Sequence, residues 1–269
     1  MSSMKAALSF SVACLALAMS TGAVAQAEPR LVSPAVLTVA PSPEYQAAMT
    51  RWQSSLTAFA NADKEKLPGT DGVLFVGSST IRFWTHLAED FRQSPVVINR
   101  GFGGSTMADC SLFARDLVVR YKPRHVLVYA GDNDLAEGRT PMQVMESFAR
   151  FANTVRDELP GTRISYISIK PSPSREALLP QIRSTNAMIA AYVHTMANAD
   201  YIDTFTPMIG EDGRPRADLF LRDRLHMNDA GYRLWQTVIS AHVAAPAVLA
   251  DTATPGALAV PTAALRPKP

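Results

Sequence analysis

Short apolar runs alternate along this chain with longer segments in which apolar side chains recur every three or four residues. The short runs cover residues 73–76, 96–98, 125–129, 164–169 and 201–202. Nearly continuous apolar runs of this length are typical of parallel strands that are covered on both faces. The periodic segments between them predict helices, so the chain reads as alternating strands and helices.

The clearest helix start is at Thr140, which is followed by a proline and stands three positions before Gln143. This order predicts an N-cap, a proline in the first turn and a capping box. Periodicity predicts further helices over 47–59, 113–121 and 182–196, and a last one that is capped by Asn228 or Asp229.

Five strands separated by helices predict a three-layer α/β/α domain in which right-handed crossovers join parallel strands. In such domains, ligands bind beyond the carboxyl ends of the strands, where the strand order reverses. Ser79, Gly104 and Asn133 each follow one of the first three predicted strands. If the strand order is 2-1-3-4-5, all three residues meet at that reversal, so we expect a functional site there.

Both ends of the chain differ in composition from its middle. In residues 1–27 an apolar run follows Lys5, the only charged residue, and small residues close the segment. This pattern predicts a secretory signal peptide cleaved near Ala25 or Ala27, and hence a periplasmic or secreted protein without a stable membrane anchor. The remaining chain divides by composition into a linker, one domain with a substantial core, and an Ala/Pro-rich disordered tail, over residues 28–43, 44–243 and 244–269.

Charge and cysteine content exclude several kinds of partner and bond. Loss of Lys5 with the signal peptide would lower the 26 Lys and Arg residues to 25, against 24 Asp and Glu residues. A nearly neutral protein lacks the positive surface that nucleic acids require, so we expect no nucleic-acid partner. Cys110 would then be the only cysteine, which rules out an intramolecular disulfide, and we expect it to be a small buried side chain.

Two serines stand on the turn after the first predicted strand, in the order Gly77-Ser78-Ser79. Ser79 is the candidate nucleophile, although a serine at this place, taken alone, is more often a helix cap. A serine hydroxyl is unreactive at neutral pH and needs a neighbouring base. Ser78 is the rival candidate, but adjacent side chains on an extended turn point in different directions, so the two serines do not share one role.

His226 is the candidate general base, because Asp223 lies three residues before it. That spacing lets the carboxylate accept a hydrogen bond from the imidazole Nδ1, which fixes the tautomer and stabilises the imidazolium. The other histidines lie in predicted helices or strands without such a motif. An incidental ion pair in a loop would show the same spacing.

Gly104 and Asn133 are candidates for an oxyanion hole. A glycine allows a backbone N–H to approach the developing oxyanion, and an asparagine amide adds a side-chain donor. Both residues could also belong to ordinary turns. Together with Ser79, Asp223 and His226, they make a full set of groups for the hydrolysis of an ester.

Motifs for other chemistries are incomplete in this sequence. Thr106 stands where a dinucleotide site would have its third glycine, and no phosphate-binding loop or His-Glu-x-x-His zinc motif is present. No Gly-x-Ser-x-Gly elbow exists, which counts against an ordinary α/β-hydrolase. A metal site built from Asp132, Asp134, Asp223 and His226 is conceivable but ranks below the serine triad.

Four fragments, taken in order, resemble the SGNH subgroup of the GDSL esterases and lipases: 77–79, 99–105, 131–134 and 223–226. The resemblance extends from Val73 to Trp235 and is nearest to the platelet-activating-factor-acetylhydrolase-like and carbohydrate-acetylesterase branches. It implies a flavodoxin-like five-stranded parallel sheet of order 2-1-3-4-5, with neither a cofactor nor a metal. It also implies a nucleophile at Ser79, a pair formed by Asp223 and His226, and oxyanion donors at the amides of Ser79 and Gly104 and the side chain of Asn133.

The chain departs from the family pattern at one position. The usual Gly-Asp-Ser is here Gly77-Ser78-Ser79, so a serine stands in place of the aspartate. Ser79 keeps the place of the nucleophile, and we expect Ser78 to cover the role of the missing carboxylate.

These residues predict an exported serine esterase that hydrolyses short-chain acyl esters through an acyl-enzyme on Ser79. Its substrate would be a small-molecule, carbohydrate or lipid ester. Two alternatives remain open, an acyltransferase that moves acetyl groups on cell-surface sugars and a non-catalytic binding module on the same fold. The sequence does not predict the oligomeric state.

Side chains that flank the motifs are candidates for an acyl or leaving-group pocket, namely Arg82, Phe83, Trp84, Met107, Leu135 and Met227. The run 170–175 follows the fourth predicted strand and could form either a wall beside the substrate or a rigid loop.

Overall fold

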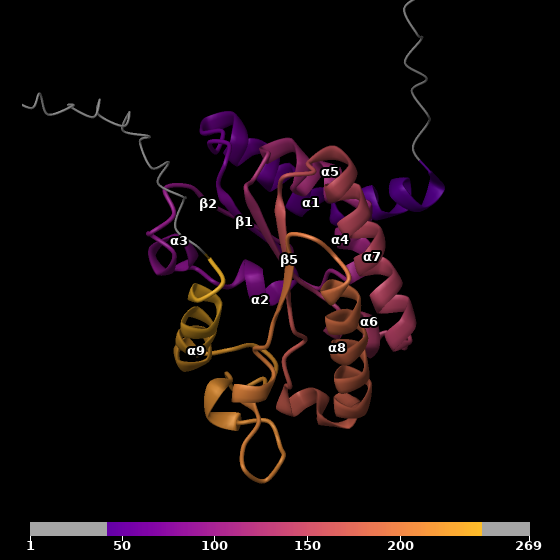
Figure 1. Ribbon diagram of the computed structural model, residues 1–269, viewed down its shortest axis with the longest axis vertical. Coiled ribbons are helices and arrows are strands. Elements are labelled where there is room, and N and C mark those ends of the chain that lie inside the picture. Colours follow the sequence, from indigo (N-terminus) through magenta and orange to yellow (C-terminus); the bar gives the residue numbers. More distant parts are fainter. Residues whose placement is uncertain (1–41, 244–269) are drawn as a thin grey trace, which may run out of the picture. The chain divides into compact units, whose positions relative to one another are not determined.

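The computed structural model describes residues 42–243, which form a central sheet with helices on both sides (Figure 1). Five parallel strands run in the order β2-β1-β3-β4-β5, which confirms the predicted order 2-1-3-4-5. The predicted signal peptide, most of the predicted linker and the predicted tail lie outside the described residues. The strands are β1 (Val73–Gly77), β2 (Val97–Gly101), β3 (His125–Tyr129), β4 (Arg163–Ile167) and β5 (Ala199–Ile202).

Two layers of helices cover the two faces of the sheet (Figure 1). One face carries α1 (Pro43–Glu65), α4 (Met107–Leu112), α5 (Ala114–Leu117), α7 (Pro141–Glu158) and α8 (Leu179–His194). The other face carries α2 (Ser79–Arg82), α3 (Leu87–Asp90) and α9 (Asp229–Ser240), while α6 (Asp132–Ala136) follows β3. Short 3-10 helices cover Val119–Tyr121, Pro173–Leu178, Thr206–Met208 and Ala217–Leu219.

Each face of the sheet has its own hydrophobic core. Successive residues of a strand point to opposite faces, so Leu74 and Val126 pack in one core, and Phe75 and Leu127 in the other. Every residue of β1 and β3 is buried. This double coverage explains why the central strands read as continuous apolar runs, and burial of each large side chain contributes about 1.5–3 kcal/mol.

The predicted helix starts are confirmed by hydrogen bonds. Thr140 Oγ1 accepts from the backbone N–H of Gln143, and Gln143 Oε1 accepts from the N–H of Thr140, which completes the capping box of α7. Asn228, rather than Asp229, caps α9, because its side chain accepts from the N–H of Gly231 at 3.1 Å.

The prediction of one helix over 113–121 is wrong. The backbone leaves helical geometry at Phe113, where α4 ends, and again at Val118, so the segment divides into α5 and a 3-10 helix. Phe113, Leu117 and Val118 are all buried. Adjacent residues of a regular helix point about 100° apart, so the break at Val118 helps both Leu117 and Val118 to reach the core.

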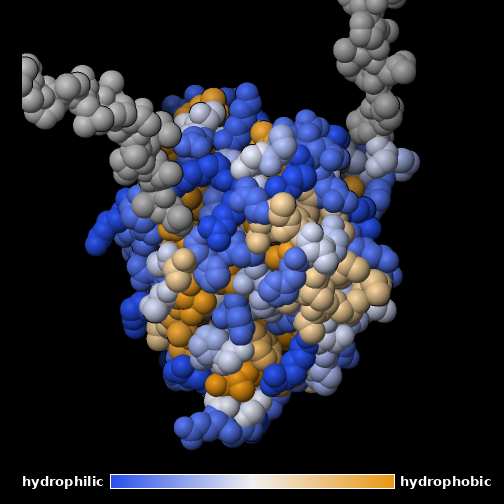
Figure 2. All heavy atoms as spheres, in the orientation of Figure 1, coloured by the Kyte–Doolittle hydropathy of each residue, from blue (hydrophilic) through white to orange (hydrophobic). Residues whose placement is uncertain are grey.

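Within residues 42–243, no helix is both long and apolar enough to cross a membrane. Hydrophilic side chains predominate on the face shown in Figure 2, with apolar ones gathered over α9. Cys110 is buried, as expected for a small core side chain, and burial raises the pKa of its thiol. The large apolar side chains exposed in this part of the chain are Met49, Leu67, Phe83, Met142 and Leu221.

Candidate active site

The two serines of the Gly77-Ser78-Ser79 turn point in different directions. The backbone at Gly77 has φ +146° and passes so close to β3 that an added Cβ would lie 1.9 Å from the carbonyl oxygen of Tyr129. Ser78 Oγ is buried and has no hydrogen-bond partner among the described residues. Ser79, the first residue of α2, is partly exposed and faces His226.

Ser79, His226 and Asp223 form a continuous chain of hydrogen bonds. The imidazole Nε2 lies 3.0 Å from Ser79 Oγ, and Nδ1 lies 2.6 Å from Asp223 Oδ2. The hydrogen bond from His226, together with backbone N–H donors, lowers the pKa of Asp223 to about 2. An ionised carboxylate only accepts hydrogen bonds, so Nδ1 carries the proton and, in neutral His226, Nε2 is free to accept from the serine.

The turn 223–226 holds the carboxylate in place through its own backbone. Asp223 Oδ1 accepts from the N–H groups of Leu225 and His226, each at 3.0 Å. Arg224, the residue after Asp223, has φ +58°, which closes the turn. The carbonyl of His226 also accepts from the N–H of Leu221 at 2.8 Å, so the base is fixed from both sides.

The predicted oxyanion residues follow β2 and β3, the two strands that flank β1, and Ser79 follows β1. Gly104 has φ +87° in the turn after β2, and a Cβ placed on its neighbour Gly103 would be 3.7 Å from Ser79 Cβ. Asn133, in the first turn of α6, donates from Nδ2 to the carbonyl of Ser105 at 3.0 Å. The structure therefore brings all five predicted site residues to the carboxyl ends of β1, β2 and β3.

The expected role of Ser78 is not supported by any contact. An aspartate at this place could hydrogen-bond with two oxygens, whereas the buried Ser78 hydroxyl bonds to none of residues 42–243. We therefore find no polar interaction by which Ser78 replaces the usual carboxylate.

Two charged residues of the loop after β4 contact the site, and the sequence did not predict their roles. Arg175 donates from Nη2 to Asn133 Oδ1 at 2.9 Å and from Nη1 to the carbonyl of Asp132. Lys170 is fully buried and lies 3.4 Å from Asp132 Oδ2 and 3.2 Å from the Tyr129 hydroxyl. The only signal in the sequence was the position of this loop beyond a strand end.

The charges of this loop determine the ionisation of Asp132. Burial alone would raise the pKa of Asp132, but the positive charges of Lys170 and Arg175 reverse that effect and hold it below its ordinary value. Burial lowers the pKa of Lys170. The carboxylate of Asp132 also accepts from the backbone N–H of Asn133 at 3.0 Å, so the ion pair is joined directly to Asn133.

The four residues considered for a metal site have other partners. Asp132 pairs with Lys170, Asp223 with His226, and Asp134 Oδ2 accepts from the N–H of Met107 at 2.7 Å. Burial raises the pKa of Asp134 to about 6. Over the described range, no group of three or more histidine, cysteine or acidic side chains is placed to hold a metal ion.

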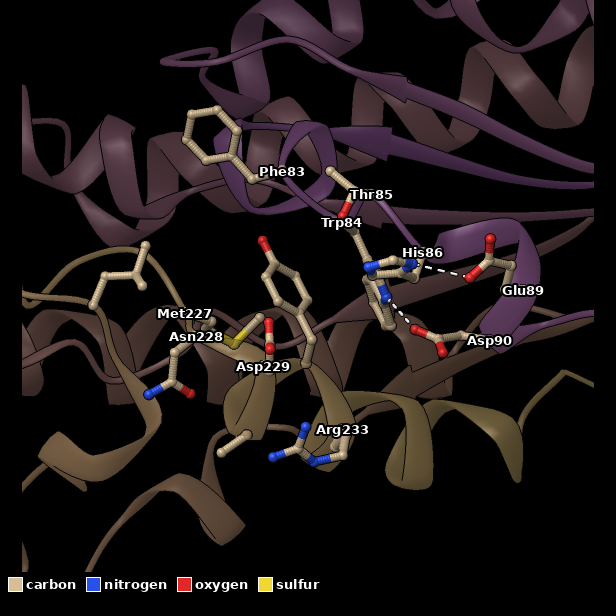
Figure 3. Close-up of a pocket in the computed structure, with 13 residues that line it drawn as sticks. Phe83, Trp84, Thr85, His86, Glu89, Asp90, Met227, Asn228, Asp229 and Arg233 are labelled. Carbon is tan, nitrogen blue, oxygen red and sulfur yellow. Dashed lines mark hydrogen bonds and ion pairs between the residues drawn. The ribbon is translucent and has the colours of Figure 1, made fainter.

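A groove of about 790 Å³ is lined by Phe83, Trp84 and Met227, among other residues (Figure 3). Its walls are the segment 83–90 on one side and the start of α9 on the other. The ring of Phe83 meets the His226 imidazole edge-on at a centroid distance of 5.0 Å, and Leu221 also lines the groove. Two of the exposed apolar side chains, Phe83 and Leu221, therefore lie next to the base.

The candidate pocket residues divide between this groove and the core. Phe83, Trp84 and Met227 line the groove. Met107 and Leu135 are instead buried in the core on the opposite face of the sheet. Arg82 is exposed, with its guanidinium 5.7 Å from the centre of the Phe83 ring.

A second group of serine, histidine and aspartate lies at the other ends of the strands. His125 Nε2 is 2.6 Å from Ser165 Oγ, which donates to Asp200 Oδ1, and Asp200 Oδ2 also bonds His242 Nδ1. Ser165 is fully buried. A serine without solvent access cannot receive a substrate, so this group has a structural role.

A family model for the GDSL-like lipase/acylhydrolase family matches residues 54–234, which is more than half of the chain. The chain belongs to this family. The match confirms the resemblance found in the sequence and includes every one of the five site residues. Among curated protein sequences, no significant match was found.

Solved structures with the same fold include further GDSL-type proteins. A GDSL-like lipase from Bacteroides thetaiotaomicron superimposes with a TM-score of 0.59 at 22% identity, over 74% of this chain and 97% of the other. A Streptococcus pneumonia protein described as a candidate platelet activating factor has a TM-score of 0.64 at 17% identity, over 73% and 94% of the two chains. An acetyl-xylooligosaccharide esterase from Geobacillus has a TM-score of 0.53 at 16% identity, over 64% and 93%. At these identities the likeness shows a shared fold.

Proposed function

We propose that this GDSL-family acylhydrolase is an exported serine esterase that hydrolyses short-chain acyl esters through an acyl-enzyme on Ser79. The observation that carries the proposal is the continuous hydrogen-bond chain from Ser79 Oγ through His226 to Asp223. These hydrogen bonds support His226 as the base for a partly exposed serine, with Gly104 and Asn133 as candidate donors for an oxyanion.

In the first half of the reaction, Ser79 Oγ attacks the ester carbonyl carbon while His226 Nε2 takes the serine proton. Asp223 stabilises the resulting imidazolium through its hydrogen bond to Nδ1. The tetrahedral intermediate collapses as His226 returns the proton to the leaving alcohol, and the acyl group stays on the serine.

In the second half, water replaces the alcohol. His226 removes a proton from the water, the hydroxyl adds to the acyl carbon, and Ser79 leaves with the proton from the imidazolium. In both halves the negative oxygen would be bound by the amides of Ser79 and Gly104 and by Asn133 Nδ2. Each such donor contributes about 10²–10³ in turnover in enzymes of this kind.

We infer that the alcohol part of the substrate binds in the groove next to Phe83 and His226. The imidazole must protonate the leaving oxygen, so the alcohol departs on the His226 side of the serine, where the groove opens. Met107 and Leu135 lie close in sequence to the candidate oxyanion residues, but their side chains are packed in the core and are not available to line an acyl pocket. We infer from this that the acyl group is small.

A panel of p-nitrophenyl esters of increasing acyl length tests the activity and the acyl preference together. We expect hydrolysis that is highest for acetate and propionate and is lost in the Ser79→Ala variant. Unchanged activity of Ser79→Ala, or no hydrolysis of any ester by the wild type, would refute the assignment. Acetylated xylo-oligosaccharide should be included, since one protein of the same fold is an esterase of that substrate.

The groove also favours a second candidate, an acyltransferase, because it could admit an acceptor alcohol in place of water. Product analysis with and without added sugar separates the two reactions. Acetylated acceptor formed in preference to free acetate would indicate the transferase.

Export is a separate part of the proposal and rests on the composition of residues 1–27. Expression of the full chain in a bacterial host, followed by fractionation and N-terminal sequencing, tests it. We expect a periplasmic or secreted product that begins at Gln26 or Glu28. An intact N-terminus on a cytoplasmic product would contradict it.

A further inference from the structure

We propose that Arg175 is a positioning residue that orients the side-chain amide of Asn133, so that one Nδ2–H faces the oxyanion. The inference rests on the proposed esterase function and assigns a role to a residue that the sequence motifs do not contain. It follows from the hydrogen bonds of the Asn133 amide taken one by one.

The Asn133 amide has one acceptor and two donor hydrogens. Its Oδ1 accepts from Arg175 Nη2 at 2.9 Å, and one Nδ2 hydrogen is donated to the carbonyl of Ser105 at 3.0 Å. One N–H therefore remains for a substrate oxygen. A half-turn of the amide would place Oδ1 against the Ser105 carbonyl and the NH₂ group against the guanidinium, so both contacts oppose it.

Arg175 is itself held by the protein. Its Nη1 donates to the carbonyl of Asp132, and its backbone N–H donates to the carbonyl of Ser172 at 2.9 Å. Pro171, Ser172 and Pro173 are buried, so the loop that carries Arg175 is anchored in the core. The guanidinium bonds to the Asp132 carbonyl and to Asn133 Oδ1 with two donors of one rigid plane. A lysine ammonium cannot reproduce this geometry.

The charge of Arg175 reinforces this orientation. Both acceptors of its hydrogen bonds are neutral oxygens, so these bonds do not neutralise the guanidinium. A cationic donor on Oδ1 polarises the amide and makes its remaining N–H a stronger donor. The effect would be greatest in the transition state, when the substrate oxygen is negative, so it should act on kcat rather than on KM.

Kinetics of purified variants with p-nitrophenyl acetate test the proposal. Loss of the whole Asn133 donor should cost about 10²–10³ in kcat, and we expect Arg175→Ala to cost about 10–100-fold, with KM changed less than about 3-fold. Arg175→Lys should recover only part of the loss. Guanidinium ion added to Arg175→Ala should restore activity measurably. The matched control is Arg214→Ala, which removes an exposed ion pair to Glu176 beside the same loop and should leave kcat unchanged.

A double-mutant cycle separates positioning from general damage. In the Asn133→Ala background, Arg175→Ala should lower kcat by less than about 3-fold further, and guanidinium should have no effect, because the amide to be oriented is gone. Equal kcat in wild type and Arg175→Ala, or losses that multiply fully in the double variant, would overturn the proposal. The same assay measures whether wild-type hydrolysis depends on Ser79. If it does not, the esterase assignment fails; if it does and Arg175→Ala behaves as wild type, only the role of Arg175 fails.

Discussion

Ser174 donates its backbone N–H to the carbonyl of Arg224 at a distance of 3.0 Å. This bond joins the loop after β4 to the turn that carries Asp223 and His226. The next residue of the same loop, Arg175, bonds to Asn133 on the other side of the site. One loop therefore contacts both Asn133 and the turn of Asp223 and His226, which helps segments far apart in sequence to keep a common geometry.

The division of roles between the two serines predicts that Ser78→Ala keeps at least about a third of wild-type kcat/KM. The Ser78 hydroxyl is buried without a partner among the described residues, so its removal breaks no hydrogen bond there and need not destabilise the fold. Steady-state kinetics beside Ser79→Ala check this. A loss of 100-fold or more in Ser78→Ala would show that the substituted position is essential.

Asn133→Ala should reduce kcat by about 10²–10³ with little change in KM, because a donor that acts on the oxyanion is used mainly in the transition state. Asn153, an exposed asparagine on α7, offers a matched control whose alanine variant should behave as wild type. Thermal unfolding of both variants shows whether the fold is intact. A rise in KM at constant kcat would place Asn133 in substrate binding instead.

Two glycines with nearly the same positive φ allow a test of whether the Gly104 amide takes part in catalysis. Gly104 has φ +87° and Gly138 has φ +85°, both are exposed, and an added Cβ meets no close backbone at either position. Alanine at each should cost about 1–2 kcal/mol in the free energy of unfolding. Only Gly104→Ala should also lower kcat, by at least about 10-fold, if its N–H binds the oxyanion as proposed. Equal activities of the two variants would exclude the Gly104 amide.

The buried cluster at the opposite ends of the strands predicts a loss of stability in acid. Burial, assisted by the charge of Arg163, lowers the pKa of His125 to about 4, while an exposed histidine in the unfolded chain titrates near 6.5. The unfolded state therefore binds more protons between these values, and the contribution of neutral His125, complete above pH 6.5, is lost as the pH falls toward 4. The lowered pKa of His125 therefore corresponds to a loss of about 3 kcal/mol in the free energy of unfolding at low pH.

Chemical denaturation between pH 4 and 7 checks this sign. The free energy of unfolding should fall more steeply with acid in the wild type than in His125→Gln. His194→Gln, at an exposed position at the end of α8, should follow the wild type. Parallel curves for all three proteins would contradict the account.

Features that are encoded locally could be predicted from the sequence. The strands were visible because each contains a short apolar run, although β2 continues through Asn99 and Arg100 beyond its run. Thr140 and Asn228 were visible because helix caps depend on a few neighbouring residues. The pairing of Asp223 with His226 was predictable for the same reason, since both lie in one turn. The meeting of Ser79 with His226, 147 positions away, was implied by the family resemblance.

Contacts that depend on packing could not be predicted. Arg175 bonds to Asn133 from 42 positions away, in a short 3-10 helix where its own backbone is non-helical, and no residue pattern marks such a contact. The break of the predicted helix at Val118 depends on which side chains the sheet can cover, which periodicity alone does not show. The sequence likewise did not reveal that the Ser78 hydroxyl lacks a polar partner within residues 42–243, because that depends on the side chains packed around it.

Covalent labelling with a fluorophosphonate, read by intact mass and peptide mapping, tests the central claim most directly. The reagent reacts with a serine that a neighbouring base activates, and it needs no knowledge of the natural ester. We predict one adduct per chain, located on Ser79, present in Ser78→Ala and absent in Ser79→Ala. An adduct on Ser78 or on another residue, or no adduct in protein that hydrolyses esters, would contradict the assignment of Ser79 as the nucleophile.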